Sequence, residues 1–333
     1  MTQQTHNHGT GRSRLVEEIE MMLRKEFGWN EVVMSERMWR FIGVNTEELL
    51  NYGINPHEWT EILRHITIDD AYMLGALHGD LYVRTMSTNW CEIAATTSST
   101  TGVMYFERLM RTIKMPGIDI SIRRRRKEGR RRNVIYVKFY ILLRRDEWPW
   151  HKEDYEIIRS FNTTELLRYV AGLVDTDGSI LIVWLPRGHR FEINITSADI
   201  EFLEHLRDII YERLGFVGVL LRDRESGGKL RFEYQEAAQF CEILLPYLSH
   251  PMRRLRTKLY QMYYNGELSE EELKHFYTPL EYDNGDDVKR LRAADMLTQA
   301  APQTHTHGEK LKTIKNKTNL PGWPSGLRRS PQD

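Results

Sequence analysis

The chain has 333 residues, 41% of them hydrophobic and 28% charged, which is typical of a globular protein long enough for two packed units. No apolar run approaches a membrane span and the first residues lack the core of a signal peptide, so a cytoplasmic protein with no membrane partner is expected. Only Cys91 and Cys241 are present, too few for a disulfide framework or a thiolate zinc site, and both should be buried.

Residues 1–65 are predicted to form a small helical extension after a polar first dozen residues. The segment that begins at Ser13 has the apolar spacing of an amphipathic helix, with Ser13 as its N-cap. From there to about Arg64 the pattern stays helical and is interrupted by turns. The sequence does not indicate what this extension does.

Two stretches, 66–150 and 151–267, share one order of predicted elements and form an imperfect internal repeat. Each begins with a short helix rich in small residues that ends at an aspartate, Asp80 or Asp177. Two strands with period-two alternation, an amphipathic helix and a β-hairpin follow in each stretch. The second stretch adds two helices. Their counterpart after the first hairpin is only a shorter helical segment around 152–159, just beyond the boundary between the two stretches. The fold class is therefore α+β with a duplicated unit.

Charge is evenly balanced over the whole chain, with 47 basic and 47 acidic residues, but it is not evenly distributed. The segment 121–145, which spans the first predicted hairpin, holds eleven Lys or Arg and the single acid Glu128. Such a density of one sign is unfavourable without a polyanion nearby. A solvated charged hairpin is the alternative interpretation.

Residues 268–333 are expected to be a largely disordered tail, because apolar density falls after about Glu267.

The helices that precede Asp80 and Asp177 carry residues small enough for two helix backbones to approach closely. In the second repeat these are Ala171, Gly172 and Thr176; in the first they are Gly75, Ala76 and Gly79. A face-to-face pair would bring the two aspartates together at the helix C-termini, where their charges repel each other and the helix dipoles. Divalent cations with hard oxygen ligands, such as Mg²⁺, relieve that repulsion, and a two-metal site can hydrolyse a phosphodiester.

The segment VAGLVDTDG at 170–178 resembles the LAGLIDADG motif at all nine positions, and MLGALHGDL at 73–81 resembles the degenerate first copy of two-repeat members. The resemblance covers about 200 residues. It implies two αββαββα repeats with antiparallel saddle sheets over DNA, and a site-specific homing endonuclease that cuts both strands. It also implies that Asp80 and Asp177 share two or three Mg²⁺ ions. The first copy departs from the pattern with His78 at the sixth position and Leu81 at the ninth.

Family resemblance suggests further catalytic-centre candidates, namely Arg253, Lys258, Ser197 and Thr97, and implies a structural role for Asp175. A solvated helix face is the alternative interpretation of Arg253 and Lys258.

A two-stranded ribbon fits the major groove of double-stranded DNA, so the hairpin cations are predicted DNA contacts. In the first repeat these are Arg123, Arg124, Arg125, Arg126, Arg130, Arg131, Arg132 and Lys138. In the second they are Arg222, Arg224, Lys229 and Arg231, which alternate with acids.

Two other functions remain open at this stage for a monomer of this kind. One is an RNA maturase that binds a group I intron RNA; the other is a DNA-binding regulator that does not cut. The presence of both aspartates favours cleavage, because a protein that only binds has no need of them.

Overall fold

The computed structural model describes residues 39, 43–56, 71–97, 99–113, 119–126, 133–148, 155–223 and 227–281. Several predicted features lie outside these ranges. They are the helix from Ser13, the turn at 127–129, the arginines at 130–132, Arg224 and the tail beyond 281.

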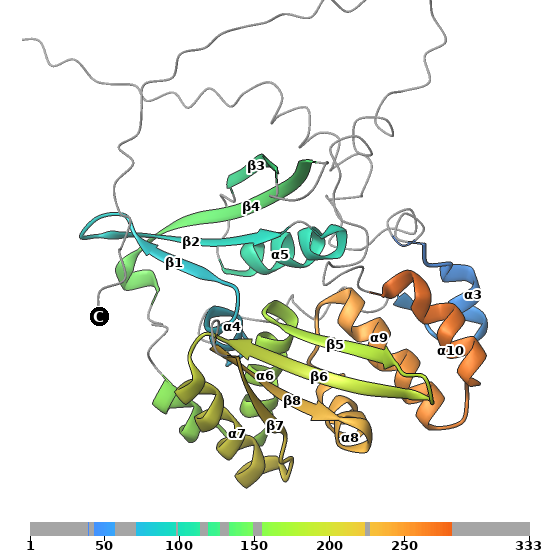
Figure 1. Ribbon diagram of the computed structural model, residues 1–333. Helices are drawn as coiled ribbons and strands as arrows, with labels where there is room; N and C mark the ends of the chain where they lie inside the picture. The colour runs from blue at the N-terminus through green and yellow to red at the C-terminus, as the bar shows by residue number, and fades with distance from the viewer. Residues whose placement is uncertain are drawn as a thin grey trace, which may run out of the picture. The chain divides into compact units, whose positions relative to one another are not determined.

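The first repeat runs helix, two strands, helix, two strands, and ends in short 3-10 turns (Figure 1). Its elements are α4 (Ala71–His78), β1 (Tyr82–Thr85), β2 (Trp90–Thr97), α5 (Thr100–Ile113), β3 (Asp119–Arg126), β4 (Asn133–Arg144), η2 (Arg145–Glu147) and η3 (Tyr155–Ser160).

The second repeat has the same order and closes with longer helices. Its elements are α6 (Thr163–Thr176), β5 (Gly178–Trp184), β6 (His189–Ser197), α7 (Ile200–Leu214), β7 (Val219–Asp223), β8 (Gly227–Glu233), α8 (Tyr234–Leu244) and α9 (Pro251–Tyr264).

Each repeat builds one four-stranded antiparallel sheet, and the two sheets have equivalent strand orders. The orders are β1-β2-β4-β3 and β5-β6-β8-β7. Since both the element sequence and the pairing recur, the predicted α+β duplication is confirmed.

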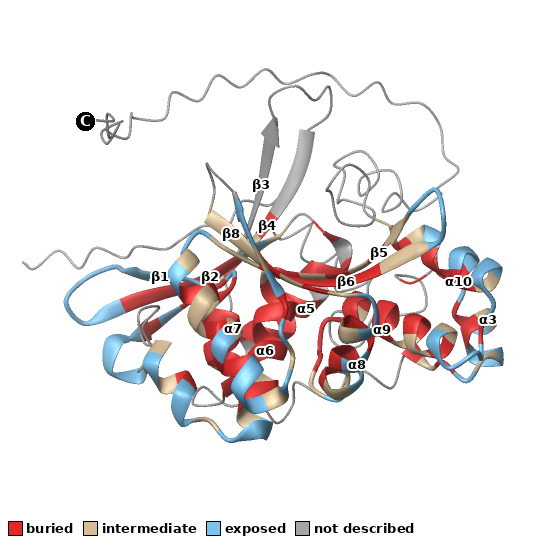
Figure 2. Cartoon of the chain, turned by 60° about the horizontal axis from the view of Figure 1, so that its bottom comes forward, coloured by how far each residue is buried: buried red, intermediate tan, exposed pale blue. Residues whose placement is uncertain are grey.

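The helices pack on one face of each sheet, and strand alternation explains why (Figure 2). On β6, Phe191, Ile193 and Ile195 point into the core and are fully buried. The intervening residues, such as Glu192 and Thr196, are polar and point to the opposite face. The same pattern on β2 buries Ile93 and Ala95. One face of each sheet is therefore apolar and helix-covered, and the other is polar.

The segment 268–281 corrects one expectation, because it is ordered and not part of a disordered tail. Ser269 and Glu272 form a capping box that starts α10 (Glu270–Tyr277), which is followed by η4 (Thr278–Leu280). The helix α10 buries Leu273 and Phe276. It contacts α3 (Thr46–Asn51) of the N-terminal extension, where Tyr52 Oη donates to Glu272 at 2.8 Å.

Both cysteines are buried thiols, as expected. Within the described ranges, no helix has the length and apolar character needed to cross a bilayer.

The helices α4 and α6 pack backbone against backbone through reciprocal glycine contacts. A Cβ added to Gly75 would lie 2.0 Å from the carbonyl oxygen of Tyr169, and one added to Gly172 would lie 2.2 Å from that of Tyr72. The members of each equivalent pair, Gly75 with Gly172 and Tyr72 with Tyr169, are 97 positions apart in sequence. The contact is therefore pseudo-twofold, and only glycine fits at its two central positions.

We expect Gly172→Ala to lower the free energy of unfolding by about 3 kcal/mol or more, because the new methyl group overlaps a carbonyl that the opposite helix holds in place. Gly188→Ala is the control. A Cβ added to Gly188 would meet nothing within 4 Å, and the φ of +87° there means that only backbone strain of about 1 kcal/mol applies. Urea unfolding measures both values, and a Gly172→Ala protein as stable as the control would contradict the close contact.

Candidate active site

The two motif aspartates lie at the ends of the paired helices. Asp177 is the C-cap of α6, is partly buried, and accepts a hydrogen bond from Thr196 Oγ1 at 3.3 Å. Asp80 is exposed in the turn after α4. Its neighbour Gly79 lies against the second motif, since a Cβ added there would be 3.4 Å from Asp177 Cβ and 2.1 Å from Thr176 Oγ1. The helix pair therefore brings the two motif ends together, as the small residues predicted.

The donor set at these ends suits hard divalent cations. Two carboxylates come from different helices, and both lie where the helix dipoles carry negative charge. In the part of the chain that the structure describes, no group of three or more His, Cys, Asp or Glu side chains could hold an ion. A divalent ion held by Asp80 and Asp177 would need further oxygen ligands from water or substrate.

The ninth motif position is filled differently in the two repeats. Gly178 is required by space, because a Cβ there would lie 2.5 Å from Val174 Cα. It is the first residue of β5 and does not have the left-handed backbone expected of a helix-ending glycine. In the first repeat α4 ends earlier, at His78, and the Leu81 N–H donates to Ala76 O at 3.1 Å. Leu81 is fully buried there without conflict.

Asp175 is a buried structural carboxylate, which supports the role implied by the resemblance. Its Oδ2 accepts hydrogen bonds from Tyr72 Oη at 2.7 Å and from Ser249 N at 2.5 Å. Burial raises the pKa of Asp175 to about 6, while Arg253 and the backbone N–H of Ser249 act to lower it. These bonds join α6 to α4 and to the loop before α9.

The equivalent position in the first repeat is His78, and its contact is the pseudo-twofold counterpart. His78 Nδ1 lies 2.6 Å from Tyr169 Oη, as Asp175 lies against Tyr72. A tyrosine of each helix therefore bonds to the sixth motif residue of the other. The pairing geometry survives although one partner is histidine and the other aspartate.

Arg253 acts on the backbone beside Asp177. Its Nη2 donates to the carbonyl of Gly178 at 2.7 Å and to that of Thr176 at 3.4 Å, and its side chain is buried. This geometry gives Arg253 a positioning role beside Asp177, and its predicted catalytic contact stays a prediction. Lys258 lies further along α9 and is partly exposed.

Ser197 and Thr97 both close the turn from the second strand of a repeat to the next helix. Ser197 Oγ accepts from Asp199 N, and Thr97 Oγ1 accepts from Ser99 N, each at 3.1 Å. Their hydroxyls therefore have a local structural task. Sequence reasoning missed the preceding residue, Thr196, which is the one bonded to Asp177.

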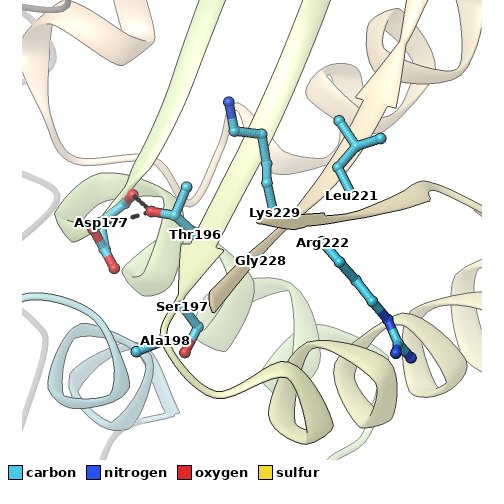
Figure 3. Close-up of a pocket in the computed structure, with 8 residues that line it drawn as sticks. All are labelled: Asp177, Thr196, Ser197, Ala198, Leu221, Arg222, Gly228 and Lys229. Carbon is cyan, nitrogen blue, oxygen red and sulfur yellow. Dashed lines mark hydrogen bonds between the residues drawn. The ribbon is translucent and has the colours of Figure 1, made fainter. Parts of the chain in front are cut away.

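A cavity of about 470 Å³ lies beside Asp177 at the end of the second sheet, where β6 and β7 end and β8 begins (Figure 3). Figure 3 shows the Lys229 and Arg222 side chains extending away from each other. The lining residues are Asp177, Thr196, Ser197, Ala198, Leu221, Arg222, Gly228 and Lys229.

The predicted DNA-contacting cations are differently placed. Arg123 to Arg126 form the end of β3. Lys138 and Arg231 are ion-paired on the uncovered sheet faces, with Glu92 at 2.6 Å and Glu233 at 3.0 Å. Arg222 is largely exposed and pairs with Glu204 of α7.

No family model and no curated protein matches the sequence significantly. The solved structures to which it is similar include LAGLIDADG proteins. The homing endonuclease I-WcaI bound to its DNA recognition sequence shares 13% identity at a TM-score of 0.45, over 64% of this chain and 98% of that one. The meganuclease I-SmaMI bound to uncleaveable DNA shares 12% sequence identity at a TM-score of 0.41, over 63% of this chain and 94% of that one. The N-terminal LAGLIDADG domain of WhiA shares 15% sequence identity at a TM-score of 0.37, over 57% of this chain and 91% of that one.

The raised pKa of Asp175 predicts a specific pH dependence of stability. A folded-state pKa of about 6, above the ordinary 3.8, means that the folded chain holds this proton more tightly than the unfolded chain. The contribution is fully present below about pH 4 and is lost as the pH rises to about 6, a change of roughly 3 kcal/mol.

Asp175→Asn removes this titration and keeps the shape of the side chain. Between pH 4 and pH 7 the natural protein should lose roughly 3 kcal/mol of unfolding free energy that the variant does not lose. The stability of the variant relative to the natural protein should therefore rise by that amount. Urea unfolding at both pH values measures it. A difference that does not change with pH would show that Asp175 is not buried in this way.

Proposed function

We propose that this chain is a site-specific, metal-dependent endonuclease of the LAGLIDADG type that hydrolyses both strands of a long DNA target. The observation that carries the proposal is the pairing of the motif ends, where Gly79 lies against Thr176 and Asp177. Two carboxylates at the C-terminal ends of paired helices are unfavourable for stability alone, so a function that uses them is the simplest reason for their presence.

Asp80 and Asp177 would hold the divalent ions, for which Mg²⁺ is our candidate. When bound, such ions stabilise charge on the attacking and leaving oxygens of a phosphodiester. The chain's own residues fix the geometry around them. Thr196 orients the carboxylate of Asp177 by donating to Oδ1, and Arg253 fixes the backbone on either side of it.

The uncovered polar sheet faces are our candidate surfaces for the duplex. Each sheet includes a two-stranded ribbon, β3-β4 or β7-β8, and ribbons of this kind fit the major groove. Four consecutive arginines end β3, so the first half is expected to supply most of the phosphate contacts. A single chain provides both motif helices, which favours a monomer. An intron-borne gene and a cytoplasmic location complete the proposal.

The test begins with binding, because a DNA target must be identified before cleavage can be measured. A randomised duplex library is selected for binding in EDTA, and the enriched duplex is then incubated with Mg²⁺. We expect double-strand cleavage that EDTA abolishes. Asp177→Asn and Asp80→Asn should each lower the cleavage rate at least 100-fold while leaving the Kd within about threefold, because removing one carboxylate affects the ions and not the sheets.

Glu270→Gln, on the outside of α10, is the matched control and should leave cleavage unchanged. Cleavage retained in either aspartate variant would refute the site. Binding without cleavage by the natural protein would favour a non-cutting regulator, and preference for a group I intron RNA over the duplex would favour a maturase.

A further inference from the structure

The two sheets repeat one row of polar side chains, and in the second repeat this row lies beside Asp177. Thr196 on β6 is paired with Lys229 on β8, and Thr96 on β2 is paired with Lys138 on β4. Directly opposed residues on antiparallel strands have Cβ atoms about 5 Å apart and share a face of the sheet. Lys229 is thus the cross-strand neighbour of the residue that bonds to Asp177. The matching row in the first repeat runs from Thr96 to Lys138.

Both rows lie near a glutamate at an equivalent position, Glu92 on β2 and Glu192 on β6. In the second repeat two arginines surround the glutamate. Arg190 Nε lies 2.5 Å from Glu192 Oε1, Arg231 Nη1 lies 3.8 Å from the same oxygen, and Asn194 Nδ2 donates to Oε2 at 3.1 Å. Glu192 is therefore neutralised without Lys229.

The first repeat lacks both arginines. Trp90 occupies the position equivalent to Arg190, and Tyr140 the position equivalent to Arg231. Arg84 lies opposite Glu92 on β1, but the ion pair that the described residues show for Glu92 is with Lys138. Lys138 Nζ lies 2.6 Å from Glu92 Oε1 and 5.1 Å from the centre of the Tyr140 ring. Glu92 precedes Thr96 by four residues, about 13 Å along the strand, so the Lys138 ammonium is drawn away from the motif end of its row.

Lys229, in contrast, lines the cavity that contains Asp177. No ion pair engages it among the residues that the structure describes. In Figure 3 its side chain extends away from the strand backbone, in the direction opposite to Arg222. An ammonium in this place can bind a phosphate oxygen by a charge-assisted hydrogen bond without first breaking another one.

We propose that Lys229 binds the backbone phosphate in the half of the site built on Asp177, and that Glu92 withholds its counterpart Lys138 from the half built on Asp80. This inference rests on the proposed function and adds to it that the two halves of the site bind phosphate unequally and cut their strands at different rates. The strand held by Asp177 and Lys229 is cut first. The other strand is cut more slowly, because its phosphate lacks a free ammonium.

The test uses the duplex selected by binding and reads out binding before cleavage. In EDTA, each phosphate contact contributes about 0.9 to the slope of log K against log salt concentration. Lys229→Met should lower that slope by about 0.9 and weaken binding several-fold. Lys138→Met should leave the slope unchanged, and Glu92→Gln should raise it by about 0.9, because it releases Lys138.

Cleavage with Mg²⁺ then follows each strand by its own 5′ label. The natural protein should accumulate nicked duplex. Lys229→Met should slow the faster strand at least tenfold, and Glu92→Gln should speed the slower strand and remove the nicked intermediate. Lys274→Met, on α10 over the Trp184 ring, is the control for loss of a surface lysine.

Lys138→Met leaves Glu92 without its partner, so Glu92→Gln/Lys138→Met is the second variant, and it should show the natural slope. The proposal would be overturned if Lys229→Met and Lys138→Met changed the salt slope equally, or if Glu92→Gln did not change it. A natural protein that binds and never cuts would refute the proposed function alone, because the salt slopes still decide which lysine contacts phosphate.

Discussion

The contact on which the rest of the site depends is backbone against backbone. The carbonyls of Tyr169 and Tyr72 occupy the space that side chains on Gly75 and Gly172 would fill. The same seam continues to Gly79, which lies against Asp177. A larger residue at either glycine would separate the helices and, with them, the carboxylates at their ends. Tyr72, Asp175 and Ser249 secure this arrangement through buried hydrogen bonds.

The duplicated frame keeps its geometry while the chemistry on it diverges. Aspartate, threonine and lysine recur in both rows, and a tyrosine crosses the helix pair from each side. The residues around this shared set differ: the first repeat has Trp90 and Tyr140 where the second has Arg190 and Arg231. Since one chain holds both halves, substitutions can accumulate in one without altering the other. On the proposed function, this permits a target whose two half-sites differ in sequence and in rate of cleavage.

Local patterns in the sequence predicted most helices and strands, but they did not predict the contacts between segments that are distant in sequence. The amphipathic helix of the first repeat and the two added helices of the second formed in the predicted order, as α5, α8 and α9, and small residues predicted the α4–α6 contact. Helix α10 was missed because its acidic first turn lowers apolar density, although Ser269 and Glu272 carry a capping box. The bond from Ser249 to Asp175 and the pairing of Lys229 with Thr196 depend on loop placement and strand register. No short motif encodes either.

The central claim is that Asp80 and Asp177 together hold divalent ions, and mapping the bound ion tests it most directly. Fe²⁺ is substituted for Mg²⁺, and ascorbate with peroxide then generates hydroxyl radicals that cut the polypeptide beside the metal. The account predicts chain cuts near residue 80 and near residue 177 at the same Fe²⁺ concentration, both suppressed by excess Mg²⁺ and both lost in Asp177→Asn. Cuts at only one of these positions, or cuts elsewhere that Mg²⁺ suppresses, would contradict it.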